Sequence, residues 1–192
     1  MYTWGYIKEN ILGKLNLDER EANELNLLSK FTYYANEAMT QICSIKPRDA
    51  FYTIIIDEHN ISKPIVMPDD FVSFNDSVIY YTTPGTKDTI EVGDDFVEYF
   101  GYNEFACSAE GSYRIPYNAR WFFFTKDVTD ATILPIPADI CDAIPSYVVS
   151  QCYKIDDEVK AATYRNEFEM FLARLDDTTF RRQYTFHVGG DW

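Results

Sequence analysis

The amino-acid sequence predicts an α+β protein: a four-helix scaffold of two helical hairpins, interrupted by an antiparallel β-sandwich or barrel. Three observations predict this class. Apolar residues recur at helical spacing near both ends of the 192-residue chain, strand-like runs fill the middle, and the acidic excess is concentrated there. We expect a helical domain formed by residues 1–50 and 136–177, a β-rich insertion over 51–135, and an extended C-terminal arm over 178–192.

The first helical hairpin is predicted over residues 3–44. Thr3 is placed to cap a helix over 3–16, and a second helix is predicted from about Glu21 to Ser44, with Pro47 ending it. Two helices with a short link pack as an antiparallel hairpin. The apolar residues that carry the two periods are Trp4, Ile7, Ile11, Leu12 and Leu15, then Leu25, Leu28, Phe31, Ala35, Ala38, Met39 and Ile42.

From Phe51 the pattern changes to short runs of β-branched and aromatic residues, separated by turns rich in Pro, Gly and Asp. Six or seven short strands at this spacing are typical of a small antiparallel sandwich or open barrel. The insertion also holds 14 Asp and Glu against 5 Lys and Arg. The runs are 51–57, 78–83, 89–92, 96–102, 112–116, 120–125 and 131–134.

Helical spacing resumes near Pro137 and continues to a charged stop at 154–157, with Pro145 expected to kink the helix or to mark a restart. A last helix is predicted from Asp157 to Leu175. Its inward residues should be Val159, Ala162, Phe168, Phe171, Leu172 and Leu175, and its outward residues Arg165, Glu169 and Arg174.

Residues 176–192 lose helical periodicity but keep an aromatic content that a disordered tail would not have. The alternation of Tyr184, Phe186 and Val188 suits a strand added to the edge of another sheet. Folding of this segment back onto its own chain is the alternative. Aromatic and Arg side chains are the usual anchors of interfaces, so the expected partner contacts are Phe180, Arg181, Arg182, Tyr184, Phe186 and Trp192.

The composition limits the class of partner. The formal net charge is −14, so the chain lacks the large basic face that phosphate binding requires. The acidity either keeps the protein soluble or lines a passage through which DNA slides without binding. Tyr and Phe number 15 and 14, which indicates either extensive interfaces or strand-rich packing. No secretory signal or membrane-spanning run is visible, and Cys43, Cys107, Cys141 and Cys152 are typical of buried thiols in a reducing compartment.

Motifs for catalysis are missing from the sequence. It has no phosphate loop, no nucleophile elbow and no zinc-protease motif, and the Cys residues have no metal-like spacing with His59 or His187. The acidic pairs at 69–70, 94–95, 156–157 and 176–177 lack the spacing of a calcium loop and are expected in solvated turns or helix starts. We therefore predict no catalytic, metal-binding or cofactor-binding residue. A hydrolase that uses unrecognised carboxylates is the remaining enzymatic alternative.

Three stretches resemble a known family. They are 3–8 with 35–42 in the first hairpin, the Pro-Asp-Asp-Phe turn within 67–76, and 144–154 leading to the Tyr-Arg-Asn-Glu-Phe stretch at 164–168. Together with the order helix–helix–insertion–helix–helix–tail, they resemble the head-to-tail connector proteins of tailed bacteriophages, the adaptor, ring or head-completion proteins beneath the portal. The ring proteins of short-tailed, crAss-like phages are one such group.

The resemblance implies a non-enzymatic structural protein of the virion, made in the host cytoplasm. Its expected assembly is a homo-oligomeric ring of about 12 copies whose head-to-tail interfaces close on rotation. The ring would link the portal to the tail or to the next ring protein, and would extend the DNA channel without binding DNA specifically. In this family the C-terminal arm commonly inserts into the portal or a neighbouring subunit, which suits 178–192.

A second hypothesis, from a different class, is a β-sandwich module that binds carbohydrate or protein. In this hypothesis an exposed Trp121 and nearby tyrosines of the insertion stack on sugar faces. It predicts that the segment 51–135 binds glycans by itself.

Overall fold

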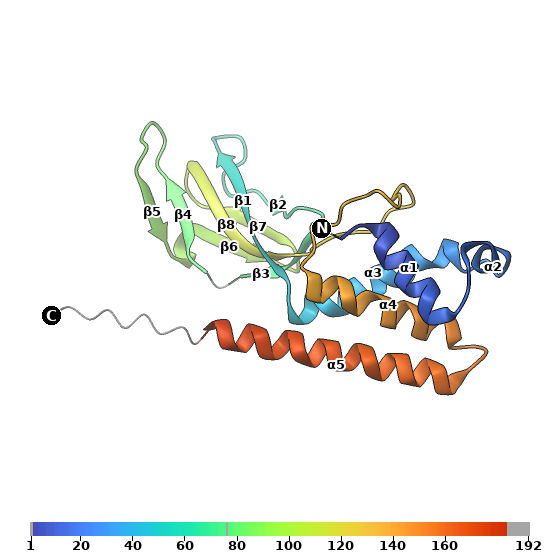
Figure 1. Cartoon of the computed structure of the whole chain (residues 1–192). Coiled ribbons are helices and arrows are strands. Elements are labelled where there is room, and N and C mark those ends of the chain that lie inside the picture. Colours follow the sequence, from blue (N-terminus) through green and yellow to red (C-terminus); the bar gives the residue numbers. More distant parts are fainter. Residues whose placement is uncertain (1, 76, 184–192) are drawn as a thin grey trace. The chain divides into compact units, whose positions relative to one another are not determined.

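A computed structural model describes residues 2–75 and 77–183; from Asp176 onward, and at Asp94, only the backbone is described. The described chain is α+β with antiparallel sheets, as the sequence predicts, but it has five α-helices where four were predicted, and its strands form no closed barrel. The chain divides into two compact units, residues 1–46 with 121–192, called the helical unit, and residues 47–120, called the β unit. Figure 1 shows the elements of each unit.

The helical unit is organised around one central helix. Helix α4 (Ala138–Tyr153) packs against α1 (Trp4–Leu15), α3 (Leu28–Ile45) and α5 (Glu158–Gln183). Residues on every side of α4 are buried between Ile140 and Ser150, because neighbouring helices cover it from several directions. Pro145 lies inside this one helix, so the predicted restart at Pro145 is wrong.

The first predicted hairpin contains an additional break. Thr3 caps α1 as predicted, its side chain accepting a hydrogen bond from the Tyr6 amide. The predicted helix over 21–44 is two helices, α2 (Glu19–Glu24) and α3. Asn26 between them adopts φ 54°, a left-handed conformation that ends α2 and that Asn tolerates better than most residues. Asp18 and Glu21 start α2 with a complete capping box, which the sequence analysis did not identify.

Residues 121–135 lie in the helical unit rather than in the predicted insertion. The Asn36 side-chain amide donates to the Phe124 carbonyl and its oxygen accepts from the Phe124 amide, both at 2.8 Å. The backbone amides of Trp4 and Gly5 donate to the carbonyls of Thr132 and Asp130. These bonds hold the segment along α1 and α3, so the two strands predicted at 120–125 and 131–134 do not form; an isolated bridge at Ile133 is the only strand-like pairing in the described part of 121–135.

The β unit contains two antiparallel sheets. The larger has the order β1–β8–β4–β5, with β3 also pairing with β8; the smaller has the order β2–β7–β6. The two sheets share one buried cluster of apolar residues that includes Phe105, Tyr113 and Ile115. The strands are β1 (Arg48–Ile56), β2 (Ile65–Val66), β3 (Phe71–Phe74), β4 (Ile79–Thr82), β5 (Thr89–Val92), β6 (Val97–Phe100), β7 (Glu104–Cys107) and β8 (Gly111–Ala119).

Five predicted runs in the insertion correspond to β1, β4, β5, β6 and β8, and three strands were missed. Of the missed strands, β2 has only two residues, and β3 and β7 have four each. Runs this short carry too few alternations for a sequence pattern to be distinguished from a loop.

Tyrosines account for much of the packing in the β unit. Tyr81, Tyr113 and Tyr117 are buried, and each hydroxyl bonds to an oxygen at the edge of the core: Glu110 carbonyl, Ala109 carbonyl and Asp70 carboxylate. The ring fills the core while the hydroxyl keeps a hydrogen-bond partner. Gly111 has φ 150°, and an added Cβ would lie 2.4 Å from the Tyr81 ring, so only glycine lets this ring pack there.

Candidate functional site

The Tyr-Arg-Asn-Glu-Phe stretch at 164–168 attaches α5 to the rest of the helical unit. The Tyr164 hydroxyl donates to the Lys14 carbonyl at the end of α1, and both Glu167 oxygens accept from the Lys14 ammonium at 2.8 and 2.9 Å. Phe168 is fully buried and makes an edge contact with the Tyr147 ring of α4. Three of these residues therefore serve packing between helices rather than contact with a partner.

Arg165, predicted to face outward, is half-buried and joins three helices. Its guanidinium donates to the Gln41 side chain of α3 at 2.9 Å and lies over the Tyr147 ring of α4 at 5.3 Å. It also pairs with Glu169 on its own helix. The prediction was wrong because a long side chain can follow an apolar surface and still place its charge at the edge.

The opposite side of α5 is exposed and has no covering element among the described residues. Val159 is 78% exposed and Met170 57%, and they lie three turns apart on one face, at about 3.6 residues per turn. Val159 and Ala162 were predicted to face inward, which is wrong, because the buried side is set by Phe168, Leu172 and Leu175. The outer face of α5 is defined here as Val159, Ala162, Thr163, Asn166, Met170 and Ala173, all exposed.

Helix α5 also extends beyond its predicted end. It continues to Gln183, so residues 178–183 are helical in backbone and the predicted extended arm does not begin at 178. Leu175 is the last residue of α5 whose side chain is described as buried. Phe180, Arg181 and Arg182 lie on the final turns of α5, where only the backbone is described, and Tyr184, Phe186 and Trp192 lie outside the described residues.

The Pro-Asp-Asp-Phe turn precedes β3 and is not simply solvated. The Asp70 carboxylate pairs with Arg48 at 2.7 Å and accepts a hydrogen bond from the Tyr117 hydroxyl at 2.9 Å. Its backbone carbonyl accepts from the Arg120 amide. Burial and the bond to Asp70 raise the pKa of Tyr117 to about 12. Asp70 therefore connects the first and last strands of the β unit to this turn, whereas Asp69 is exposed as predicted.

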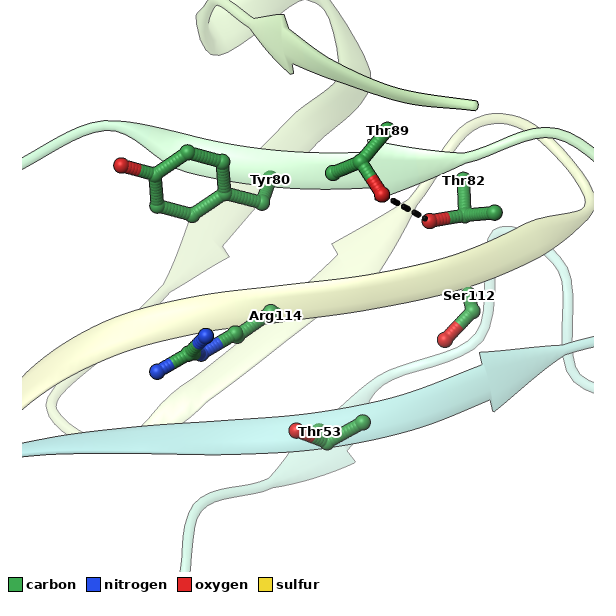
Figure 2. Close-up of a pocket in the computed structure, with 6 residues that line it drawn as sticks. All are labelled: Thr53, Tyr80, Thr82, Thr89, Ser112 and Arg114. Atoms are coloured by element: carbon green, nitrogen blue, oxygen red, sulfur yellow. Dashed lines mark hydrogen bonds between the residues drawn. The ribbon is translucent and has the colours of Figure 1, made fainter. Parts of the chain in front are cut away.

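A shallow polar pocket of about 260 Å³ lies on the outer face of the larger sheet. Figure 2 shows Arg114 and Tyr80 at one end and Ser112, Thr82 and Thr89 at the other. The register of the strands explains this grouping. One row of direct neighbours crosses β1, β8 and β4 and consists of Thr53, Arg114 and Tyr80. The adjacent row crosses β8, β4 and β5 and consists of Ser112, Thr82 and Thr89. No local sequence pattern indicates this pocket, because it forms only when four strands pair.

Trp121, on which the carbohydrate hypothesis depended, is not part of the β unit. It belongs to the helical unit, is partly buried, and its indole Nε1 donates to the Lys46 carbonyl at 2.8 Å. A stacking platform built on Trp121 within the insertion is therefore wrong.

No group of three or more His, Cys, Asp or Glu side chains in the described residues is arranged to hold a metal ion. Cys107 and Cys141 are buried thiols with no disulfide, and burial raises the pKa of each to about 12, which opposes the thiolate that a nucleophile requires. Asp157 caps the start of α5, and its bond from the Lys160 amide lowers its carboxyl pKa.

Comparison with protein-family models and with curated proteins gives no match to this chain. None of the helices in the described part of the chain combines the length and apolar composition that crossing a bilayer requires.

Proposed function

We propose that the chain is a structural subunit of a ring at the head–tail junction of a tailed bacteriophage. In this proposal the ring lies below the portal, links it to the tail and extends the DNA channel. The observation that carries the proposal is the outer face of α5, which lies opposite the buried side of a helix firmly attached to its bundle. The resemblance of the helical segments and the Pro-Asp-Asp-Phe turn to connector proteins is the second support.

The outer face of α5 has the composition of a helix–helix contact. Ala162, Thr163 and Ala173 are small enough to let another backbone approach, while Val159 and Met170 supply exposed apolar area. Bonds to Lys14 and Gln41 fix α5 on α1 and α3, so a neighbouring subunit would meet a rigid surface. A head-to-tail contact on such a surface relates each subunit to the next by a fixed rotation. The subunits close into a ring when a whole number of these rotations makes one full turn.

The β unit would supply the acidic surface of the assembly. Because its two sheets share one apolar core, we propose that the β unit is a small sandwich. Exposed carboxylates outside its strands, such as Glu58, Asp69 and Asp95, repel phosphate. They fit a subunit beside which DNA passes without binding.

The proposed docking element is the end of α5 together with the tail. The proposal places portal contacts at Phe180, Arg181, Arg182, Tyr184, Phe186 and Trp192. Because every copy in a ring engages at once, weak individual contacts give strong binding overall.

Two deletions test the docking element. Removing residues 184–192, or 178–192, is expected to abolish capture by the portal protein encoded in the same genome, while the helical unit stays folded by circular dichroism. Capture at the unmodified level by both truncated chains would overturn the docking assignment.

A paired substitution tests the side contact. Val159→Glu with Met170→Glu places two charges on the outer face of α5 and is expected to prevent ring formation, measured by mass photometry. The matched control is Leu25→Glu with Val66→Glu, which makes the same charge change at two exposed apolar residues elsewhere. A ring that survives the first pair as well as it survives the control would exclude α5 as the side contact.

A further inference from the structure

The polar pocket on the outer face of the larger sheet contains an arginine without a carboxylate partner. Among the described residues Arg114 forms no ion pair, although the chain carries 31 acidic residues against 17 basic ones. Its guanidinium lies 3.9 Å over the Phe51 ring, and no described residue accepts a hydrogen bond from its N–H groups. An unpaired guanidinium is suited to bind a planar anion with two parallel hydrogen bonds.

The charge around the pocket favours a singly charged group. Glu91 is opposite Tyr80 on the same face, and the chain as a whole carries a net charge of −14. A doubly charged phosphate would meet more repulsion from these groups than a carboxylate would. Among singly charged anions, a carboxylate is planar and presents two oxygens that match the fork of the guanidinium.

The other end of the pocket consists of hydroxyl groups. Thr82 and Thr89 bond to each other at 3.1 Å, and the hydroxyls of Ser112, Thr53 and Tyr80 have no bond to any described residue. A hydroxyl both donates and accepts, so this row matches a ligand that carries hydroxyls of its own. A protein carboxylate alone would occupy the Arg114 end and leave the row to water.

Distance and volume limit the size of such a ligand. The Cα atoms of Ser112 and Arg114 are about 6.6 Å apart along β8, and the Arg114 side chain extends away from Ser112 (Figure 2). A ligand that reaches both groups is therefore at least as long as a six-membered sugar ring with its carboxylate. The volume of about 260 Å³ equals roughly nine water molecules at ~30 Å³ each. It lies below the ~300–1,000 Å³ typical of pockets for larger ligands.

We propose that this pocket binds one carboxylate-bearing sugar, a hexuronate residue, with its carboxylate on Arg114 and its hydroxyls on the Ser112, Thr82 and Thr89 row. The site does not depend on assembly into a ring. It also differs from a stacking platform, because hydrogen bonds and one charge would hold the ligand.

The test is a titration of the isotope-labelled full chain followed by amide chemical shifts. D-glucuronate is expected to shift the amides of β1, β4 and β8 around the pocket and to saturate. D-glucose, which lacks the carboxylate, and acetate, which lacks the hydroxyls, are each expected to bind at least ten-fold more weakly. Acetate that binds as well as glucuronate, or shifts that fall outside these strands, would overturn the proposal.

Substitutions assign the interaction to the pocket. Arg114→Gln is expected to weaken glucuronate binding at least ten-fold, whereas Lys63→Gln, which removes an exposed cation elsewhere in the β unit, leaves it unchanged. Ser112→Ala keeps the charge and is expected to weaken glucuronate two- to five-fold without changing acetate binding. Equal glucuronate affinity in the Arg114 variant and the Lys63 variant would contradict the site, and the Ser112 variant provides the same test if Arg114→Gln does not fold.

Discussion

The two units of this chain build their cores in different ways. The helical unit buries mainly aliphatic side chains around α4, such as Ile11, Ile42 and Ile144, with Tyr147 as its one buried tyrosine among the described residues. Two other tyrosines, Tyr153 and Tyr164, lie at the edge, where they bond to carbonyls at the end of α1. In the β unit, the three tyrosines Tyr81, Tyr113 and Tyr117 lie in the core itself, so this unit depends more on tyrosine for its interior.

This difference explains where the aromatic excess is used. A small two-sheet unit has little interior, so large rings bury much area per residue, and their hydroxyls reach partners at the core edge. Helices can fill their interior with aliphatic side chains in well-defined rotamers. We therefore expect the two units to respond differently to core truncation, to high pH and to loss of an ion pair.

The largest effect is expected from truncation in the helical core. Phe168→Ala removes a fully buried ring that packs on α4, and should lower the free energy of unfolding by about 3–5 kcal/mol. Tryptophan fluorescence during chemical denaturation measures this unit selectively, since Trp4 and Trp121 lie in it and residues 47–120 contain no Trp. Ile155→Ala, at a 90% exposed side chain of the same unit that lies outside the outer face of α5, is the control and should change stability by less than about 0.5 kcal/mol.

High pH should affect the β unit through its buried phenols. The pKa values of Tyr113 and Tyr117 are raised from 10.0 to about 12 by burial. Because the folded state holds these protons more tightly, their contribution to stability is complete below pH 10 and is lost as pH rises from 10 to 12. Cys107, raised from 9.0 to about 12, begins the loss near pH 9.

Near-UV circular dichroism during denaturation at pH 8, 10 and 11 measures this loss. Tyr113→Phe is the informative variant, because it removes one titrating phenol and should flatten the decline between pH 10 and 12. An unchanged slope in that variant would show that Tyr113 does not carry the dependence.

A smaller effect is expected at the turn of the β unit. Asp70→Asn removes the charge that pairs with Arg48 and weakens the bond from Tyr117, and should cost about 1 kcal/mol, since the pair is partly exposed to solvent. Asp69→Asn changes the charge equally at an exposed position. In thermal unfolding, the Asp70→Asn variant should have the lower melting temperature of the two. Equal melting temperatures would contradict the role given to Asp70.

The smallest effect is expected from the ion pair that links α1 to α5. Both Lys14 and Glu167 are about one-third exposed, so solvent weakens their attraction. Glu167→Gln should lower the stability of the helical unit by about 0.5 kcal/mol, and 0.5 M salt should reduce the difference from the unmodified chain. A cost that did not change with salt would indicate packing rather than charge.

The sequence predicted local features better than long-range ones. The helix starts at Thr3 and Asp157 and the end near Pro47 were predictable, because caps and proline act within one turn. Residues 120–134 were assigned to strands because they are aromatic and β-branched, but hydrogen bonds from Asn36 and Trp4, far away in sequence, determine their conformation.

Prediction of the candidate sites has the same physical limit. The exposure of Val159 could not be predicted, because helical spacing allowed it to lie on either side of α5. Arg114 and Thr89 come together only after β8 and β5 both pair with β4. No pattern within a short stretch of sequence predicts the register of these pairs. Sequence alone thus predicted the class and the main helices, while both exposed surfaces required the structure.

The most direct test of the ring proposal is the mass of the assembled protein. If the ring proposal holds, native mass spectrometry of the full chain at tens of micromolar, alone and with the portal protein that the proposal implies, should show one closed species, of about 12 copies as the resemblance to connector proteins implies. Val159→Glu with Met170→Glu should reduce that species to monomer, while Leu25→Glu with Val66→Glu keeps it. A chain that stays monomeric under both conditions would contradict the account.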